Sequence, residues 1–238
     1  MMEQLIAGAR QLDLALTERQ VTSFRAYYEH VIEWNSRANL TAITDYEEVQ
    51  IKHFLDSLTC LKAMGAVKPG ERLIDVGSGA GFPGLVLAIA RPDLDVTLLE
   101  ATTKKALFLE HVATSLGLPN VRIVNARAEE LGHDPAHREA YHWAAARAVA
   151  DLAELVEYLL PFCRLDGRGL AQKGPDVAEE IAGAARAIEI LGGCLERTLS
   201  LQLPFLNEWR TLVVVAKARP TPAAYPRRPG IPHKRPIR

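Results

Sequence analysis

Hydrophobic positions change their spacing near residue 70, and this change divides the chain into two kinds of predicted structure. Before that point, apolar residues recur at intervals of three and four, which is the spacing of one helix face. The clearest series is Val21, Phe24, Tyr28, Val31 and Ile32. The first part of the chain is therefore expected to be helical.

Two capping patterns mark helix starts in this part. Thr17 with Gln20, and Asp45 with Glu48, each place a short polar residue three positions before a Gln or Glu, as in a capping box. Residues 35–39 break the helical pattern between them. We therefore expect one helix from Thr17 to about residue 35 and another from Asp45 to the glycine at 65.

From Arg72 onward, short apolar runs alternate with longer amphipathic runs. Strands are expected at 73–76, 96–100, 121–125, 142–147, 169–172, 194–203 and 209–218, and helices at 82–90, 102–116, 151–162 and 176–191. This alternation predicts an α/β fold, a doubly wound and mostly parallel sheet covered on both faces. Ligands of such sheets bind at the carboxyl ends of the strands. The expected divisions are a helical extension at 1–66, a cofactor-binding domain at 67–219 and a basic Pro/Arg-rich tail at 220–238.

A glycine-rich loop follows the first expected strand and reads Asp75-Val-Gly-Ser-Gly-Ala-Gly-Phe-Pro-Gly84. Glycines permit positive φ and let a ligand approach the backbone. Gly77, Gly79 and Gly81 match the GxGxG of methyltransferases, whereas Gly79, Gly81 and Gly84 match the GxGxxG of dinucleotide enzymes. A plain tight turn is the third interpretation.

Two carboxylates near this loop bear on the choice. Glu100 lies 21 residues after Gly79 and could bind ribose hydroxyls in either kind of site. Asp75 precedes the first glycine and could hold the loop or meet the cationic end of a methionine. A pyrophosphate would gain nothing from it, so Asp75 favours S-adenosylmethionine.

Composition narrows the setting. The 238 residues are 48% hydrophobic and 24% charged, as in an ordinary globular protein. No apolar run is long enough to span a membrane, and the start of the chain does not resemble a signal peptide. The three cysteines lie far apart, which predicts neither a zinc site nor a disulfide, and no metal is expected. A cytoplasmic location is the resulting expectation.

Charge is unevenly distributed. Residues 217–238 carry seven Lys or Arg and no acid, so residues 1–216 hold a net charge of −8 within a total of −1. The tail could be a solvated charge run, but its prolines should keep it semi-extended beside an acidic body. This arrangement favours contact with RNA phosphates.

Several polar residues have both a structural and a functional interpretation. Glu129 could start a helix or border a cofactor, and Arg147 could pair with Asp151 or Glu154 or hold a phosphate or a base. His53 lies three residues before Asp56 and could form a functional pair. A helix surface with support between Lys52 and Asp56 is the alternative. The aromatic residues Trp34, Tyr27 and Tyr28 fit a core better than base stacking.

The loop and four other segments resemble the RsmG (GidB) family of rRNA guanine-N7 methyltransferases, and this resemblance covers nearly the whole chain. The other segments are Trp34-Asn35 with Asn39-Leu-Thr-Ala-Ile43, Lys52-His-Phe-Leu-Asp-Ser57, Ala146-Arg-Ala148, and Tyr225-Pro-Arg-Arg-Pro-Gly-Ile-Pro-His-Lys-Arg-Pro236. Glu100 is a mild departure, since many relatives have Asp there.

The resemblance implies a seven-stranded Rossmann-like methyltransferase fold and methylation of one guanine N7 in 16S rRNA, in the small ribosomal subunit. The expected cofactor-binding residues are Asp75, Gly77, Ser78, Gly79, Phe82, Glu100, Ala101, Thr102, Ala128, Glu129 and Arg147. Arg147 and His53 are expected to be catalytic, and Arg227, Arg228, Lys234 and Arg235 to bind RNA. No membrane and no obligatory protein partner are expected.

Three other functions stay open at this point. One is an NAD-dependent oxidoreductase that uses the second glycine register. Another is a ribosome assembly factor whose methyl transfer is incidental or lost. The last is a methyltransferase acting on DNA or on a small molecule.

Overall fold

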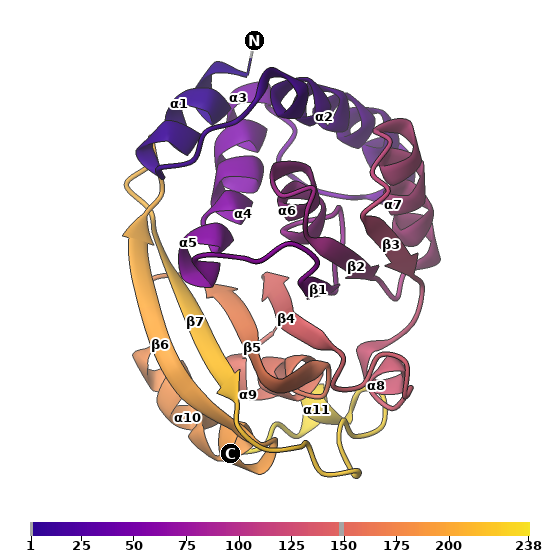
Figure 1. The fold of residues 1–238 in the computed structure, drawn as a ribbon, viewed down its shortest axis with the longest axis vertical. Coiled ribbons are helices and arrows are strands. Elements are labelled where there is room, and N and C mark those ends of the chain that lie inside the picture. Colours follow the sequence, from indigo (N-terminus) through magenta and orange to yellow (C-terminus); the bar gives the residue numbers. More distant parts are fainter. Residues whose placement is uncertain (1, 148–149) are drawn as a thin grey trace.

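Seven strands form one sheet in the order β3-β2-β1-β4-β5-β7-β6 in the computed structural model, which describes residues 2–147 and 150–238 (Figure 1). The strands are β1 Arg72–Val76, β2 Asp95–Leu99, β3 Val121–Val124, β4 Tyr141–Arg147, β5 Cys163–Lys173, β6 Gly193–Gln202 and β7 Trp209–Lys217. Strands β1 to β5 are parallel, and β7 runs antiparallel between β5 and β6. The expected doubly wound, mostly parallel sheet is confirmed. The antiparallel β7 departs from the 3-2-1-4-5-6 order of dinucleotide-binding sheets.

Helices cover both faces of the sheet, and several of them are short. They are α1 Glu3–Gln11, α2 Glu18–Ala38, α3 Tyr46–Val49, a π-helix at Gln50–Leu55, α4 Asp56–Leu58, α5 Cys60–Met64, α6 Gly84–Ala90, α7 Thr103–Ser115, α8 Ala128–Leu131, α9 Leu152–Leu159, α10 Ala178–Ile190 and α11 Ile231–Lys234. Among the described residues, no helix is both long and apolar enough to span a bilayer.

Alternation along the central strands separates two hydrophobic cores. Leu73 and Ala145 face the core formed with α1 to α7, whereas Ile74 and Ala146 face the core formed with α8 to α10. The N-terminal helices thus share one core with a sheet face, and the tail contributes Tyr225 to the other core. The division expected at residue 66 stays a prediction.

The first capping box is present and the helix it opens is longer than expected. Gln20 N–H donates to Thr17 Oγ1 at 3.3 Å, and Thr17 N–H donates to Gln20 Oε1 at 2.8 Å. The expected break at residues 35–39 is wrong for its first part, because α2 continues to Ala38 and ends at Asn39 with a φ of 48°. The Asn35 side chain instead accepts the N–H groups of Leu40 and Thr41 and shapes the following loop.

The second capping pattern is half present. Asp45 Oδ1 accepts the N–H groups of Glu47 and Glu48, each at 2.9 Å. The helix it opens is interrupted by the π-helix before it reaches Gly65, which the periodicity did not predict. Helix α1 was also not predicted, and α6 begins at Gly84 rather than at Phe82. Ala148 of the Ala146-Arg-Ala148 segment lies outside the described residues.

Candidate active site

The glycine loop lies where the sheet order reverses, between β1 and β4, and it connects β1 to α6. Gly77, Gly79 and Gly81 have φ values of 75°, 57° and 96°, which side chains rarely adopt. All three glycines of the first register therefore meet a backbone requirement.

The glycines of this loop serve different purposes. A Cβ on Gly81 would overlap the hydroxyl of Tyr27, which donates to Ala80 O, so Gly81 lets α2 pack on the loop. A Cβ on Gly84 would overlap the carboxylate of Asp75. A Cβ on Gly79 would meet only a carbonyl oxygen at 3.9 Å. Of these three glycines, Gly79 is the one that leaves room for a ligand.

Asp75 holds the loop, which was one of its two expected roles. Its Oδ2 accepts the N–H of Gly84 at 2.9 Å, at the start of α6. Burial raises the pKa of Asp75 to about 7. Its Oδ1 is buried and has no hydrogen-bond partner within residues 2–147 and 150–238. A buried acceptor left without a donor suits a cationic ligand group.

Glu100 joins the end of β2 to the glycine loop. Its Oε2 accepts the N–H of Gly79 at 2.8 Å, and its Oε1 accepts the N–H of Thr102 at 2.7 Å. Ala101 and Thr102 are exposed beside it. Each carboxylate oxygen keeps a further acceptor site, so a ribose hydroxyl can still donate to it. Ribose binding by Glu100 stays a prediction.

Residues Ala128 and Glu129 follow β3 and begin the short helix α8. Glu129 is buried, and its Oε1 accepts the N–H of Gly230 from the C-terminal tail at 3.0 Å. The edge beside β3 therefore includes a part of the chain that lies 101 residues away. The proposed adenine contact of Glu129 is untested.

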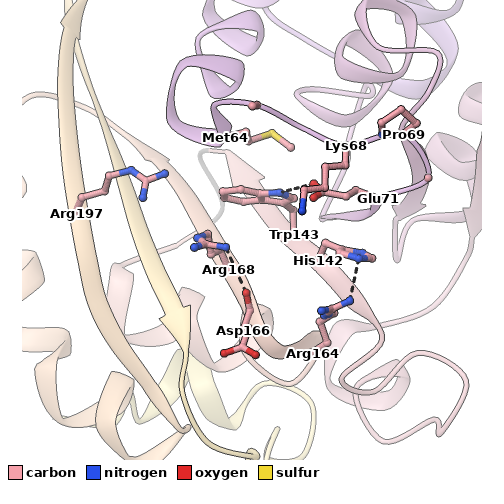
Figure 2. Close-up of a pocket in the computed structure, with 12 residues that line it drawn as sticks. Met64, Lys68, Pro69, Glu71, His142, Trp143, Arg164, Asp166, Arg168 and Arg197 are labelled. Atoms are coloured by element: carbon pink, nitrogen blue, oxygen red, sulfur yellow. Dashed lines mark hydrogen bonds between the residues drawn. The ribbon is translucent and has the colours of Figure 1, made fainter.

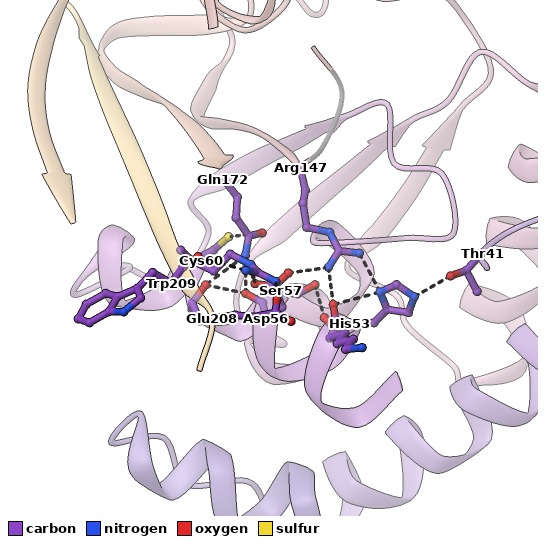
Figure 3. A network of polar contacts seen from close by, with 12 residues as sticks. Thr41, His53, Asp56, Ser57, Cys60, Arg147, Gln172, Glu208 and Trp209 are labelled. Carbon is purple, nitrogen blue, oxygen red and sulfur yellow. Dashed lines mark hydrogen bonds and ion pairs between the residues drawn. The ribbon is translucent and has the colours of Figure 1, made fainter. Parts of the chain in front are cut away.

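Arg147 ends β4 and lies at the centre of a polar network with His53 and Asp56 (Figure 3). Its guanidinium forms an ion pair with Asp56 at 3.2 Å, and Nη2 lies 3.3 Å from His53 Nδ1. The alternative pairing with Asp151 or Glu154 is wrong, because Asp151 caps α9 and Glu154 accepts a hydrogen bond from Tyr158.

The π-helix and α4 supply the other side of this network. Both His53 and Asp56 are buried, and a cavity of about 390 Å³ lies against them and Arg147. The expected support between Lys52 and Asp56 is wrong, because Lys52 pairs with Glu48 at 2.6 Å. A π-helix inside a longer helix is frequent at functional sites.

Phe82 of the glycine loop connects the two halves of the site. The His53 ring stacks on Phe82 with centroids 4.4 Å apart, and the Arg147 guanidinium lies 4.9 Å from the same ring. Burial and the nearby Arg147 lower the pKa of His53 to about 3. At neutral pH the imidazole is uncharged and a weak base. His53 Nε2 lies 2.8 Å from Thr41 Oγ1.

Three residues of this region were not predicted. Arg210, at the start of β7, pairs with Asp56 at 3.0 Å, and Gln172 of β5 donates to Asp56 Oδ1 at 2.8 Å. Tyr27 of α2 meets the loop as described above. Gln172 lies 116 residues from Asp56 along the chain, and Arg210 lies 154 residues from it. No local sequence motif therefore marks either residue.

A larger cavity, of about 570 Å³, lies at the opposite ends of the strands (Figure 2). Trp143, Arg164 and Arg168 line it. Arg164 Nη1 lies 3.0 Å from His142 Nε2, and Arg168 pairs with Glu196 at 2.7 Å. None of the expected site residues lies in this cavity. Ligands of such sheets bind at the carboxyl ends of the strands, so this cavity is not the candidate site despite its size.

The four basic residues expected to bind RNA fall into two groups. Arg228, Lys234 and Arg235 are exposed. Arg227 instead forms an ion pair with Glu157 at 2.6 Å, and Glu157 is fully buried. The expected semi-extended tail is wrong, because the tail is folded against the domain and contains the short helix α11.

Candidate metal ligands gather at one place among the described residues. His30 and Glu33 of α2 and His111 of α7 have ligand atoms within 4.8 Å of one another. The two imidazoles contact each other, with His30 Nδ1 3.2 Å from His111 Nε2. This contact explains the cluster without an ion. The expectation that no metal is needed stays untested.

The sheet order, the glycine loop after β1 and the carboxylate after β2 together define a Rossmann-like methyltransferase fold. Solved structures share it at low sequence identity. A mutant of MtNAS in complex with S-adenosylmethionine has a TM-score of 0.55 at 16% identity, covering 85% of this chain and 73% of that one. Geranyl diphosphate methyltransferase in complex with SAM has a TM-score of 0.53 at 15% identity, with 77% and 95% covered.

Sequence relatives are much nearer. The chain is 52% identical to a "Ribosomal RNA small subunit methyltransferase G" of Pelotomaculum thermopropionicum over 99% of this chain and 98% of that protein. It is 52% identical to the protein of the same name from Roseiflexus sp., over 99% and 100%. The family model described as "GidB: rRNA small subunit methyltransferase G" matches residues 20–207. The chain belongs to this family.

Proposed function

We propose that this protein transfers the methyl group of S-adenosylmethionine to N7 of one guanine in 16S rRNA, within the cytoplasm. The observation that carries this proposal is family membership over nearly the whole chain, combined with an intact glycine loop at the point of sheet reversal. Three observations argue against an NAD-dependent oxidoreductase. They are the glycine register that includes Gly77, the antiparallel β7 and the names of the sequence relatives.

The residues around the loop fit S-adenosylmethionine. The unpartnered Oδ1 of Asp75 suits the cationic methionine end, and the space above Gly79 suits a group lying against the backbone. Glu100 would accept hydrogen bonds from the ribose, and Glu129 would lie beside the adenine. The bound cofactor supplies a methyl group activated by a positively charged sulfur.

The network around Arg147 fits a reaction that needs no general base. Guanine N7 is an acceptor with a lone pair and no proton, so nothing must be removed before it attacks. A His53 with a pKa near 3 would be a poor base, which agrees with this chemistry. Catalysis would then depend on alignment, an effect worth roughly 7–11 kcal/mol in well-oriented model reactions.

Arg147 has a defined role in this proposal. Its guanidinium would donate to guanine O6, while Asp56 and the Phe82 ring hold it in place. The exposed cations Arg228, Lys234 and Arg235 would contact RNA phosphates and contribute a salt-dependent part of the affinity.

The test is incubation with radiolabelled S-adenosylmethionine and small ribosomal subunits from a strain lacking the activity. We expect label in a single N7-methylguanine of 16S rRNA. Arg147→Ala should lower kcat/KM at limiting RNA at least tenfold, whereas the exposed Arg122→Ala should change it less than twofold. Label in another molecule, or equal activity of the Arg147→Ala variant, would contradict the substrate or the role of Arg147 respectively.

A further inference from the structure

The C-terminal segment 221–238 packs against the region of α8 and α9 (Figure 1). Three of the carboxylates that it contacts are buried and belong to these helices. Glu129 and Glu154 are each 7% exposed, and Glu157 is 0% exposed. Three acids buried close together need compensating donors, because an ionised carboxylate without a partner is costly in a protein interior.

Arg227 supplies the strongest of these contacts. Its backbone N–H donates to Glu157 Oε1 at 2.8 Å, and its side chain donates to both carboxylate oxygens, at 2.9 Å from Nε to Oε1 and 2.6 Å from Nη2 to Oε2. This is a bidentate pair of the kind that fixes geometry as well as charge. Breaking it would leave Glu157 buried and unpaired.

The same segment holds the residues that follow β3. Gly230 N–H donates to Glu129 Oε1 at 3.0 Å from a φ of 78°. His133 Nε2 lies 2.7 Å from Pro226 O, and Arg138 donates to Tyr225 O at 2.8 Å. Glu129 belongs to α8, which has only four residues and cannot be stable alone. Its position therefore depends on the tail.

We propose that segment 221–238 is a clasp that positions the β3 side of the cofactor pocket, with Arg227 as its positioning residue. Arg227 anchors the tail on Glu157, and the anchored tail directs the carboxylate of Glu129. This inference rests on the proposed function, since it takes Glu129 to border S-adenosylmethionine. It gives Arg227 a positioning role beside the cofactor pocket rather than a contact with RNA.

The adjacent Arg227 and Arg228 provide a matched pair. Both are arginines in the same turn of chain, but Arg228 is exposed and has no ion-pair partner among residues 2–147 and 150–238. Loss of either removes one positive charge from the tail. Any difference between the two variants in cofactor affinity therefore reflects the clasp and not the net charge.

The experiment measures S-adenosylmethionine affinity by calorimetry and RNA affinity by filter binding, on the full-length chain. Arg227→Ala should weaken cofactor binding about tenfold or more, and Arg228→Ala should leave it within twofold. Arg227→Lys should recover only part of the loss, because a single ammonium cannot reproduce the bidentate pair. Gly230→Ala, which strains the backbone without adding a contact, should weaken cofactor binding by a smaller factor.

A second variant distinguishes a loss of cofactor binding from a folding defect. In Arg227→Ala/Glu157→Gln no buried charge is left unpaired, so the fold should be retained while cofactor binding stays weak. Equal cofactor affinity of Arg227→Ala and wild type, or a loss confined to RNA binding, would overturn the clasp. Failure of the wild type to bind S-adenosylmethionine would instead overturn the proposed function.

Discussion

The glycine loop and the Arg147 network differ in how far apart their partners lie along the chain. In the loop, Gly84 bonds to Asp75 across nine residues and Gly79 bonds to Glu100 across 21. In the network, Arg147 and Arg210 reach Asp56 across 91 and 154 residues. Both regions lie at the carboxyl ends of strands and meet at Phe82.

This difference separates what makes a ligand site from what holds it in place. The loop needs particular backbone angles, so the residue types that form it are adjacent in the sequence. The network needs several charges to compensate one another, and only the completed sheet brings them together. We therefore expect the residues of the network to contribute more to stability than the local features do.

The largest effect should come from Asp56→Ala. It would leave Arg147 and Arg210 without their shared carboxylate, and breaking a buried ion pair costs about 3–5 kcal/mol. Urea denaturation measures the free energy of unfolding. The control is Asp13→Asn, which removes the charge of an exposed partner of Lys62 at a φ of 57° that Asn also tolerates, and it should cost about 0–1 kcal/mol. Similar losses for both variants would break the comparison.

A smaller effect should separate two glycines within the loop. Gly81→Ala would force an alanine to a φ of 96° and against Tyr27, so we expect a loss of roughly 2–4 kcal/mol. Gly79→Ala would bring its Cβ no nearer than 3.9 Å to a neighbour, so only its φ of 57° should cost, about 1 kcal/mol, but it should weaken S-adenosylmethionine binding at least tenfold. Thermal unfolding and calorimetry on both variants test this. A Gly79→Ala variant with normal cofactor affinity would contradict it.

The features that the sequence predicts correctly depend on contacts between residues close in the chain. The strand–loop–helix order, the left-handed glycines and the cap at Thr17 all follow from residues close in sequence. Glu100 was located because the end of the next strand must lie beside the loop in a parallel sheet.

The features that the sequence does not predict depend on a partner far away in the chain. Glu157 lies 70 residues before Arg227, and no residue near Arg227 indicates this pairing. In the sequence, an arginine of a structural ion pair therefore has the same pattern as one that binds RNA. The π-helix is also not predicted, because its residues keep the hydrophobic pattern of an ordinary helix. Arg147 and His53 lie together, but the sequence leaves Asp56 open between a functional pair with His53 and a helix surface, and its carboxylate pairs with Arg147 and Arg210 instead.

Asp75→Asn tests how the buried carboxylate of the loop affects stability and its dependence on pH. Burial raises the pKa of Asp75 to about 7, so the folded chain holds a proton that the unfolded chain releases near pH 4. The stability contributed by Asp75 is thus lost as the pH rises from about 4 to 7. Asn keeps an acceptor for Gly84 N–H without this cost. We expect a gain of roughly 1–3 kcal/mol at pH 8 and a flatter pH dependence by denaturation.

The matched control is Asp93→Asn, since the Arg91 side chain lowers the pKa of that surface carboxylate. Here the sign reverses: stability is present above the unfolded pKa and falls as pH decreases, so the substitution should cost a little at pH 8. Cofactor affinity should fall in Asp75→Asn alone, because the methionine end would lose its carboxylate. A less stable Asp75→Asn variant at pH 8 would show that the charged form is favoured in the fold.

The smallest effect should come from the capping box that the sequence reveals most directly. Thr17→Ala removes the acceptor for Gln20 N–H and should cost about 1 kcal/mol, measured by urea denaturation. Thr22→Ala, one turn into the same helix, should instead gain up to about 0.5 kcal/mol, since Ala has the higher helix propensity and the Thr22 hydroxyl bonds only to Glu18 O. Gln20 also donates to Ala90 O at 2.8 Å, which connects the cap to the end of α6. A loss at Thr17 as large as that at Asp56 would therefore mean that this local cap transmits through α6 to the cofactor loop, and the division between local and remote contributions would fail.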